Sequence, residues 1–210
     1  MTYVLFGFEN SGSVAIEIAL DLCGIEYRLV KAATWEEGEG LNELTKANPL
    51  HQLPTLKLPD GSILTESAAI LIHLGLQFPA ANLLPSDSIR RAQIIRGLVF
   101  IAANCYPAIS VIDYPMRWCL DADDNTNERI RAGAKERLHA HWEIFADQFP
   151  ATPFLNGEQA GALDILAAVV SKWSGTRQHL QKSRPDFYAT LERIEKLPVF
   201  ADVFAKRWKN

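Results

Sequence analysis

The segment from residue 48 to residue 74, NPLHQLPTLKLPDGSILTESAAILIHL, constrains the fold more than any other part of the chain. A short extended run, 55–58, precedes Pro59-Asp60-Gly61, whose residue types favour a reversal of the chain, and Ile63-Leu64 then returns. From Ser67 onward most residues are apolar, which is typical of a helix covered by other structure. The segment therefore predicts a strand, a turn, a second strand and a buried helix.

Glu66 and Ser67, at the start of this predicted helix, suit a ligand that carries both an ammonium and a carboxylate group. The unpaired N–H groups and the partial positive charge of a helix start favour a carboxylate, and the Ser67 hydroxyl adds a donor. Glu66 favours the ammonium group. A capped helix with a solvated acid has the same pattern, so the pair alone does not distinguish a binding site from a helix cap.

Residues 3–30 predict a strand, a helix and a second strand. The run 3–6 is apolar and aromatic, 14–23 is a largely apolar stretch that ends at a glycine, and 27–30 is again extended in character. Strands joined in this way are parallel, and the connection between them is right-handed.

The loop after the first strand lies where open α/β sheets tend to bind ligands. It contains Asn10, Ser11 and Ser13, whose side chains are hydrogen-bond donors, and it contains no cysteine. A turn that only caps the next helix has the same composition, so the loop alone favours no chemistry.

Residues 77–87, QFPAANLLPSD, break the apolar pattern with two prolines and predict a domain boundary. We expect an α/β domain with the order βαβαββα over residues 1–79, a linker over 80–87, and an all-helical domain over 88–210. In the helical part, apolar residues recur every three or four positions from 130 to 149, which predicts one long helix.

Residues 162–170 are apolar almost throughout, which predicts a central buried helix. Asp164 lies three residues after Gly161, so its carboxylate can accept from the Gly161 N–H as in a capping box, without the reciprocal side-chain bond. We assign Asp164 to folding and not to catalysis. His139 and His141, two residues apart on a helix, point to different sides, so no metal site is expected there.

The composition of the chain excludes several classes of partner. The formal net charge is −4, the pI is about 5.7 and the 21 basic residues are scattered, so we expect neither a nucleic acid nor a membrane partner. No run approaches the roughly 20 apolar residues of a membrane span, and the N-terminus lacks a secretory signal, so we expect a cytoplasmic protein. Cys23, Cys105 and Cys119 form neither a disulfide framework nor a zinc motif and are expected to be mostly buried.

The segment 48–74 resembles the glutathione-binding segment of the cytosolic glutathione S-transferase family. The matching motifs are Asn48-Pro49, Leu53-Pro54-Thr55-Leu56, Asp60-Gly61 and LTESAAI at 64–70, in the same order and spacing. The resemblance implies a thioredoxin-like βαβαββα domain followed by a helical bundle, with class undetermined among bacterial-type members.

The resemblance also implies how glutathione is held. The Leu53–Pro54 bond is cis in the family, and the backbone of Leu53 pairs with the cysteinyl residue of glutathione. Gln52 reaches the glycyl end, and Glu66 with Ser67 holds the γ-glutamyl end. Glutathione is therefore the expected co-substrate.

In this family the loop after the first strand supplies the tyrosine, serine or cysteine that handles the glutathione sulfur. Here Asn10 stands where theta and zeta members have a serine, and Gly12 stands where beta members have a cysteine. Without a cysteine, mixed-disulfide chemistry is not expected. We predict that Asn10, or Ser11 as second choice, donates to the thiolate, whereas Ser13 belongs to the helix cap.

By resemblance, the pocket for the second substrate lies beside the stretch 103–119, which two prolines are expected to disturb. Tyr106, Tyr114 and Trp118 are the predicted lining residues, although core packing explains each of them equally well. Trp35 is a candidate for the glycyl end of glutathione or for an interface.

The predicted activity is attack of the glutathione sulfur on a small hydrophobic electrophile, by a homodimer as in the family. A second enzymatic possibility is a glutathione-dependent isomerase or dehalogenase, which uses the same thiolate in a different reaction. A binding module that keeps the fold without turnover is the alternative from another class.

Overall fold

A mixed four-stranded sheet organises the N-terminal part of the computed structural model, which describes residues 2–33 and 37–208. The strand order is β2-β1-β3-β4, with β1 parallel to β2 and antiparallel to β3, and β3 antiparallel to β4. The strands are β1 (Tyr3–Gly7), β2 (Tyr27–Lys31), β3 (Thr55–Lys57) and β4 (Ile63–Leu64). The register pairs Phe6 with both Val30 and Thr55, so β1 lies at the centre.

Helices cover both faces of this sheet, because successive side chains of a strand point to opposite faces. Leu5 of β1 joins the main core with α1 (Ser13–Leu22) and α3 (Ser67–Gln77). Phe6 joins a smaller cluster with Leu44 of α2 (Glu39–Ala47) on the opposite face. The order βαβαββα and the thioredoxin-like arrangement are confirmed.

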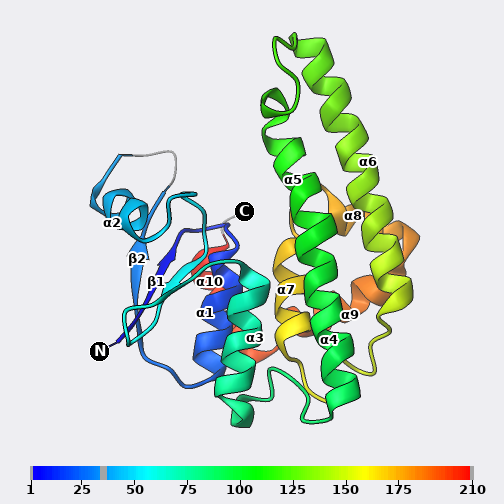
Figure 1. Ribbon diagram of the computed structural model, residues 1–210. Helices are drawn as coiled ribbons and strands as arrows, with labels where there is room; N and C mark the ends of the chain where they lie inside the picture. The colour runs from blue at the N-terminus through cyan, green and yellow to red at the C-terminus, as the bar shows by residue number, and fades with distance from the viewer. Residues whose placement is uncertain (1, 34–36, 209–210) are drawn as a thin grey trace.

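The C-terminal part is helical, as expected. In Figure 1, α4, α5 and α6 form a tall hairpin that extends past the sheet domain, and α7 lies at the centre. Every residue of α7 is buried, which fits its sequence, apolar except for Asp164. The elements are η1 (Pro79–Ala81), α4 (Ser88–Phe100), the π-helix η2 (Ile101–Cys105), α5 (Tyr106–Asp113), η3 (Pro115–Arg117), α6 (Asp124–Gln148), α7 (Ala162–Val170), α8 (Thr176–Ser183), α9 (Pro185–Glu195) and α10 (Pro198–Arg207).

The helical stretch that begins at Ser88 continues through α4, η2 and α5 to Asp113. Pro107 does not break it; a π-helical turn precedes the proline and the helix continues. By length and composition alone this helix is apolar enough to cross a membrane, contrary to the expectation that no run approaches that length. Ile94, Leu98 and Ile101 are buried in the protein core, and core helices pass the same test.

The predicted boundary near residues 80–87 coincides with a change in architecture. Helix α4 begins at Ser88, where the carboxylate of Asp87 accepts from the Arg90 N–H at 2.8 Å. The main hydrophobic core nevertheless runs through both parts, joining Leu20 of α1 to Leu166 of α7. The division of the chain into separate domains, 1–79 and 88–210, therefore stays a prediction.

The N-terminus of α7 is built around a buried carboxylate. Asp164 accepts hydrogen bonds from the backbone N–H groups of Leu155 at 2.8 Å, Asn156 at 3.0 Å and Gly161 at 3.0 Å. The predicted bond from Gly161 is thus confirmed, and two further bonds join it. A Cβ on Gly161 would lie 2.5 Å from the Asn156 amide nitrogen and 2.7 Å from the Leu83 oxygen. Glycine replaces the usual serine here because no space for a side chain exists.

Helix α10, near the end of the chain, packs against α1, the first helix (Figure 1). Glu17 of α1 is 2% exposed, and its carboxylate accepts from the Arg207 guanidinium at 2.8 Å. Burial raises the pKa of the Glu17 carboxyl, whereas the bond from Arg207 lowers it. Since a buried charge is costly without its partner, this ion pair ties the two ends of the chain together.

We expect Arg207→Gln to lower the free energy of unfolding by about 2 kcal/mol, because it leaves the Glu17 carboxylate unpaired in the core. Urea unfolding at neutral pH measures the change. Arg28→Gln is the matched control, since Arg28 pairs with Glu43 in solvent and such pairs contribute little. Equal losses in the two variants would contradict the assignment.

Candidate functional site

The loop before β3 has the conformation that the sequence implied. The Leu53–Pro54 bond is cis, which confirms that prediction. Buried Asn48 holds the loop: its amide donates to the Thr55 hydroxyl at 2.9 Å and to the Gln52 carbonyl at 3.2 Å. The side chain of Gln52 is exposed next to this bend. The sequence motif includes Asn48 but does not predict these bonds to the loop.

The start of α3 places an acid and a hydroxyl side by side. Ser67 is the first residue of the helix and is 7% exposed, and Glu66 precedes it with an exposed side chain. Glu66 has a φ of 64°, in the left-handed region that costs about 1–3 kcal/mol for a non-glycine residue. Backbone strain of this kind is concentrated at functional sites. The helix start therefore offers N–H groups and a hydroxyl to an anion, with a carboxylate beside them.

The two serine hydroxyls of the loop after β1 bind the loop itself. The Ser11 hydroxyl donates to the Phe8 carbonyl at 2.8 Å and lies 2.9 Å from the Ser13 hydroxyl oxygen. The Ser13 oxygen accepts from the Phe8 N–H at 3.1 Å and is buried. These contacts close a turn at the start of α1, in which Gly12 is the N-cap without a side-chain cap bond and Ser13 is the first residue of the helix.

Asn10 is held in place by the C-terminal part of the chain. Its backbone N–H donates to the Arg207 carbonyl at 3.0 Å, and its carbonyl accepts from the Trp173 indole at 3.3 Å. Its φ is 55°, a left-handed conformation that asparagine tolerates better than most residues. The helical part of the chain therefore fixes the loop residue that we predicted to act on the sulfur.

Of the three predicted pocket residues, Tyr106 is the one whose contacts reach the segments described above. Its hydroxyl lies 3.4 Å from the Ser67 hydroxyl. Tyr114 and Trp118 instead lie at the far end of α5, with 42% and 59% of their surface exposed, and the Tyr114 ring lies under the Arg117 guanidinium. Eight residues of helix, roughly 12 Å, separate Tyr106 from Tyr114. The structure therefore does not bring the three side chains together, and a pocket role for Tyr114 and Trp118 stays a prediction.

Two tryptophans that sequence analysis did not single out complete the surroundings of Tyr106. The ring of Trp173 lies 6.0 Å from that of Tyr106, and the ring of Trp208 lies 5.8 Å from that of Trp173. Both belong to segments far from the glutathione-like motif. The sequence signal for Trp173 is its position in a short break after the apolar helix, two residues before Gly175.

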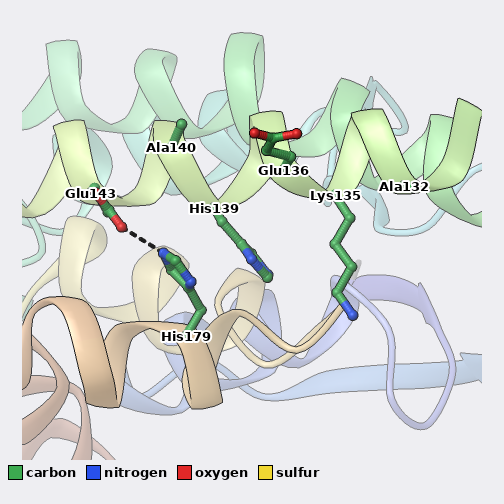
Figure 2. Close-up of a pocket in the computed structure, with 7 residues that line it drawn as sticks. All are labelled: Ala132, Lys135, Glu136, His139, Ala140, Glu143 and His179. Atoms are coloured by element: carbon green, nitrogen blue, oxygen red, sulfur yellow. Dashed lines mark hydrogen bonds and ion pairs between the residues drawn. The ribbon is translucent and has the colours of Figure 1, made fainter. Parts of the chain in front are cut away.

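A hollow of about 450 Å³ lies elsewhere, between α6 and α8 (Figure 2). His139 and His179 stack there with ring centroids 4.3 Å apart, and His179 bonds to Glu143 at 2.6 Å. His141 points to another neighbour, the Asn104 carbonyl, so the prediction that His139 and His141 diverge is confirmed. Among residues 2–33 and 37–208, no group of three or more His, Cys, Asp or Glu side chains could hold a metal ion.

The cysteines carry no sign of reactivity. Cys105 is buried, and burial raises its pKa to about 12; Cys23 is half-buried, and burial raises its pKa to about 11. Cys119 is also half-buried, so the expectation of mostly buried cysteines holds fully only for Cys105. The thiols of Cys23 and Cys105, held protonated by burial, are poor nucleophiles. Trp35, a candidate for the glycyl end, lies outside the described residues.

Comparison with known proteins relates the chain to the glutathione S-transferases. Residues 13–77 match the family model described as "Glutathione S-transferase, N-terminal domain". The chain is 29% identical to the uncharacterized GST-like protein YncG of Escherichia coli K12, over 96% of this chain and 97% of that one. It is 25% identical to glutathione S-transferase GstA of Escherichia coli O157:H7, over 96% of each. A glutathione transferase homolog from Sulfitobacter, solved with bound glutathione, has the same fold, with a TM-score of 0.85, 22% identity and 98% coverage of both chains.

The cis-proline loop, the acid and hydroxyl at the start of α3 and the two-part architecture agree with this match. Both of these relatives are bacterial. The segment 13–77 belongs to the N-terminal domain family of the glutathione S-transferases, and the whole chain is similar to bacterial members of that family.

Proposed function

We propose that this protein binds glutathione and joins it through its sulfur to a small hydrophobic electrophile. The observation that carries the proposal is the meeting of three segments: the loop of residues 8–13, the cis-proline bend and the start of α3. A Cβ on Gly12 would lie 3.3 Å from Pro54 Cδ and 3.6 Å from the Leu53 oxygen, which sets the loop directly against the bend.

The proposed contacts follow from the chemistry of each group. The N–H groups at the start of α3 and the Ser67 hydroxyl receive the γ-glutamyl carboxylate, and Glu66 receives the ammonium group. The backbone of Leu53 pairs with the cysteinyl residue, and Gln52 contacts the glycyl end. Glutathione bound in this way has its sulfur beside the loop that carries Asn10 and Ser11.

The reaction needs a thiolate close to its target. The glutathione thiol releases its proton to solvent, an S–C bond forms at the electrophilic carbon, and the leaving group departs with its electron pair. A helix start and hydrogen-bond donors stabilise the thiolate, and holding both reactants together raises the rate. Asn10 and Ser11 stay the predicted donors from the N-terminal loop, although the Ser11 hydroxyl already donates to Phe8.

Isothermal titration with glutathione tests the proposal. We expect saturable binding in the range of about 1 µM to 1 mM that is typical of enzyme substrates. Turnover is then measured with glutathione and a panel of aryl halides, epoxides and maleyl compounds. Conjugation of any of these supports the transferase; isomerisation of maleyl compounds alone supports the isomerase, and halide release without a stable conjugate supports the dehalogenase. Saturable binding without turnover supports a binding module, and no binding at millimolar glutathione contradicts all of them.

A homodimer in the cytoplasm is also part of the proposal, by analogy with the family. Large apolar side chains on the first domain and on α4 support a protein interface. Leu50, Leu76, Ile89 and Val99 are each more than half exposed. Side chains of this kind are commonly covered when a partner binds.

A further inference from the structure

The hydroxyl of Tyr106 lies where the three segments of the proposed glutathione site meet, although Tyr106 belongs to the helical part of the chain. It lies 3.4 Å from the Ser67 hydroxyl at the start of α3. A Cβ on Gly12 would lie 2.8 Å from the same hydroxyl, and 3.3 Å from Pro54. The tyrosine oxygen is therefore next to the loop, the bend and the helix start at once.

A π-helix sets the direction of this side chain. The Tyr106 N–H donates to the Ile101 carbonyl, five residues back, which closes the π-turn. Each residue of a helix turns the chain by roughly 100°, so one extra residue per turn rotates everything after it. The ring then packs against Trp173, at 6.0 Å between centroids. Single π-turns of this kind are frequent at functional sites, and here the turn aims Tyr106 at the first domain.

The Tyr106 hydroxyl remains protonated at neutral pH. Burial, with the negative charge of Glu66 adding to it, raises the pKa of Tyr106 to about 12, while the Ser67 contact lowers it. Because the phenol already holds its proton, it does not accept the proton of a thiol, but it can donate a hydrogen bond to a thiolate. The Ser11 hydroxyl, by comparison, already donates to the Phe8 carbonyl.

We propose that Tyr106 donates a hydrogen bond to the sulfur of bound glutathione, so that the helical part of the chain supplies the thiolate donor. The inference rests on the proposed function, because it requires glutathione in the site. It moves the role of Tyr106 from lining the pocket of the second substrate, as the resemblance implies, to contacting the sulfur. The thiol proton goes to solvent, and the tyrosine keeps its own.

The test compares wild-type protein with Tyr106→Phe, which keeps the ring and its contact with Trp173. The ultraviolet absorbance of the thiolate, followed against pH, gives the pKa of the glutathione thiol on the protein. We expect that pKa to rise by about one unit in Tyr106→Phe, a tenfold loss of thiolate at neutral pH. The dissociation constant of S-methylglutathione, which has no thiol, should stay within about twofold.

Tyr114→Phe is the matched control, since it removes the same hydroxyl from an exposed tyrosine that directly follows α5. It should leave the thiol pKa unchanged. An unchanged thiol pKa in Tyr106→Phe overturns the inference while the proposed function stands. Weaker binding of S-methylglutathione with an unchanged thiol pKa overturns it too, because the hydroxyl then serves the γ-glutamyl carboxylate beside Ser67. Absence of glutathione binding in the wild type overturns both.

Discussion

The Ser67→Ala variant is expected to bind glutathione roughly 10- to 100-fold more weakly than the wild type. Hydrogen bonds to charged groups contribute about 1.5–3 kcal/mol, and every 1.4 kcal/mol is a factor of about ten in a dissociation constant. The hydroxyl lies at the first residue of α3, where an anion also meets the helix N–H groups. Isothermal titration measures the change, and adding Glu66→Gln should weaken binding further by removing the partner of the ammonium group.

Ser62→Ala provides the control for this variant. Ser62 lies in the exposed turn between β3 and β4, and its hydroxyl donates to Asp60 at 2.6 Å. The substitution removes an equivalent hydroxyl from the same domain, and glutathione binding should not change. If Ser67→Ala also binds glutathione as tightly as the wild type, the helix start is not the carboxylate site. Urea unfolding of both variants shows whether a loss of binding reflects a loss of fold.

Replacing Asp164 with alanine should lower the free energy of unfolding by about 3–5 kcal/mol. The substitution leaves the backbone N–H groups of Leu155, Asn156 and Gly161 without their acceptor at a fully buried position. Each unpaired buried donor costs about 1–3 kcal/mol, offset by relaxation of the loop. Chemical denaturation measures the loss. Asp147→Ala, which removes an exposed carboxylate that pairs with Arg184, should have a far smaller effect.

The same carboxylate predicts a dependence of stability on pH. Burial raises the pKa of Asp164 to about 6, although three backbone N–H groups oppose the shift. The folded protein therefore binds this proton more tightly than the unfolded chain does, and stability from this group is lost as the pH rises from about 4 through 6. The wild type should lose stability over this range relative to Asp164→Asn, which has no titrating carboxyl. A difference that stays constant with pH would show that Asp164 does not titrate there.

The features that the sequence predicted correctly depend on residues close together in the chain. The strand-turn-strand-helix order comes from one continuous segment, 48–74. The cis bend at Leu53–Pro54 in the same segment is implied by the resemblance to a known family and not by local propensity. The Gly161 bond to Asp164 spans three residues. Local propensity and spacing are sufficient for such features, because the interacting groups are fixed by the same few backbone angles.

The features that the sequence did not reveal depend on distant packing. The Trp173 indole donates to the carbonyl of Asn10, which lies 163 residues earlier in the sequence. The approach of Tyr106 to Gly12 depends on a π-turn, and one residue of helical register decides whether the side chain faces the first domain. Tyr114 and Trp118 are aromatic like Tyr106, yet their side chains are exposed to solvent at the far end of the hairpin. Periodicity indicates that a helix has an apolar face, but not which neighbour that face meets.

The ties between α10 and the first domain limit how this protein can be recombined with its relatives. Arg207 follows the helical part in sequence, but its guanidinium pairs with Glu17 and its carbonyl receives the Asn10 N–H. A chimera joined at the linker, with a first domain from another family member, separates these groups from their partners. The exchangeable unit is therefore the first domain together with α10, and a crossover that divides them breaks an ion pair and releases the loop at Asn10.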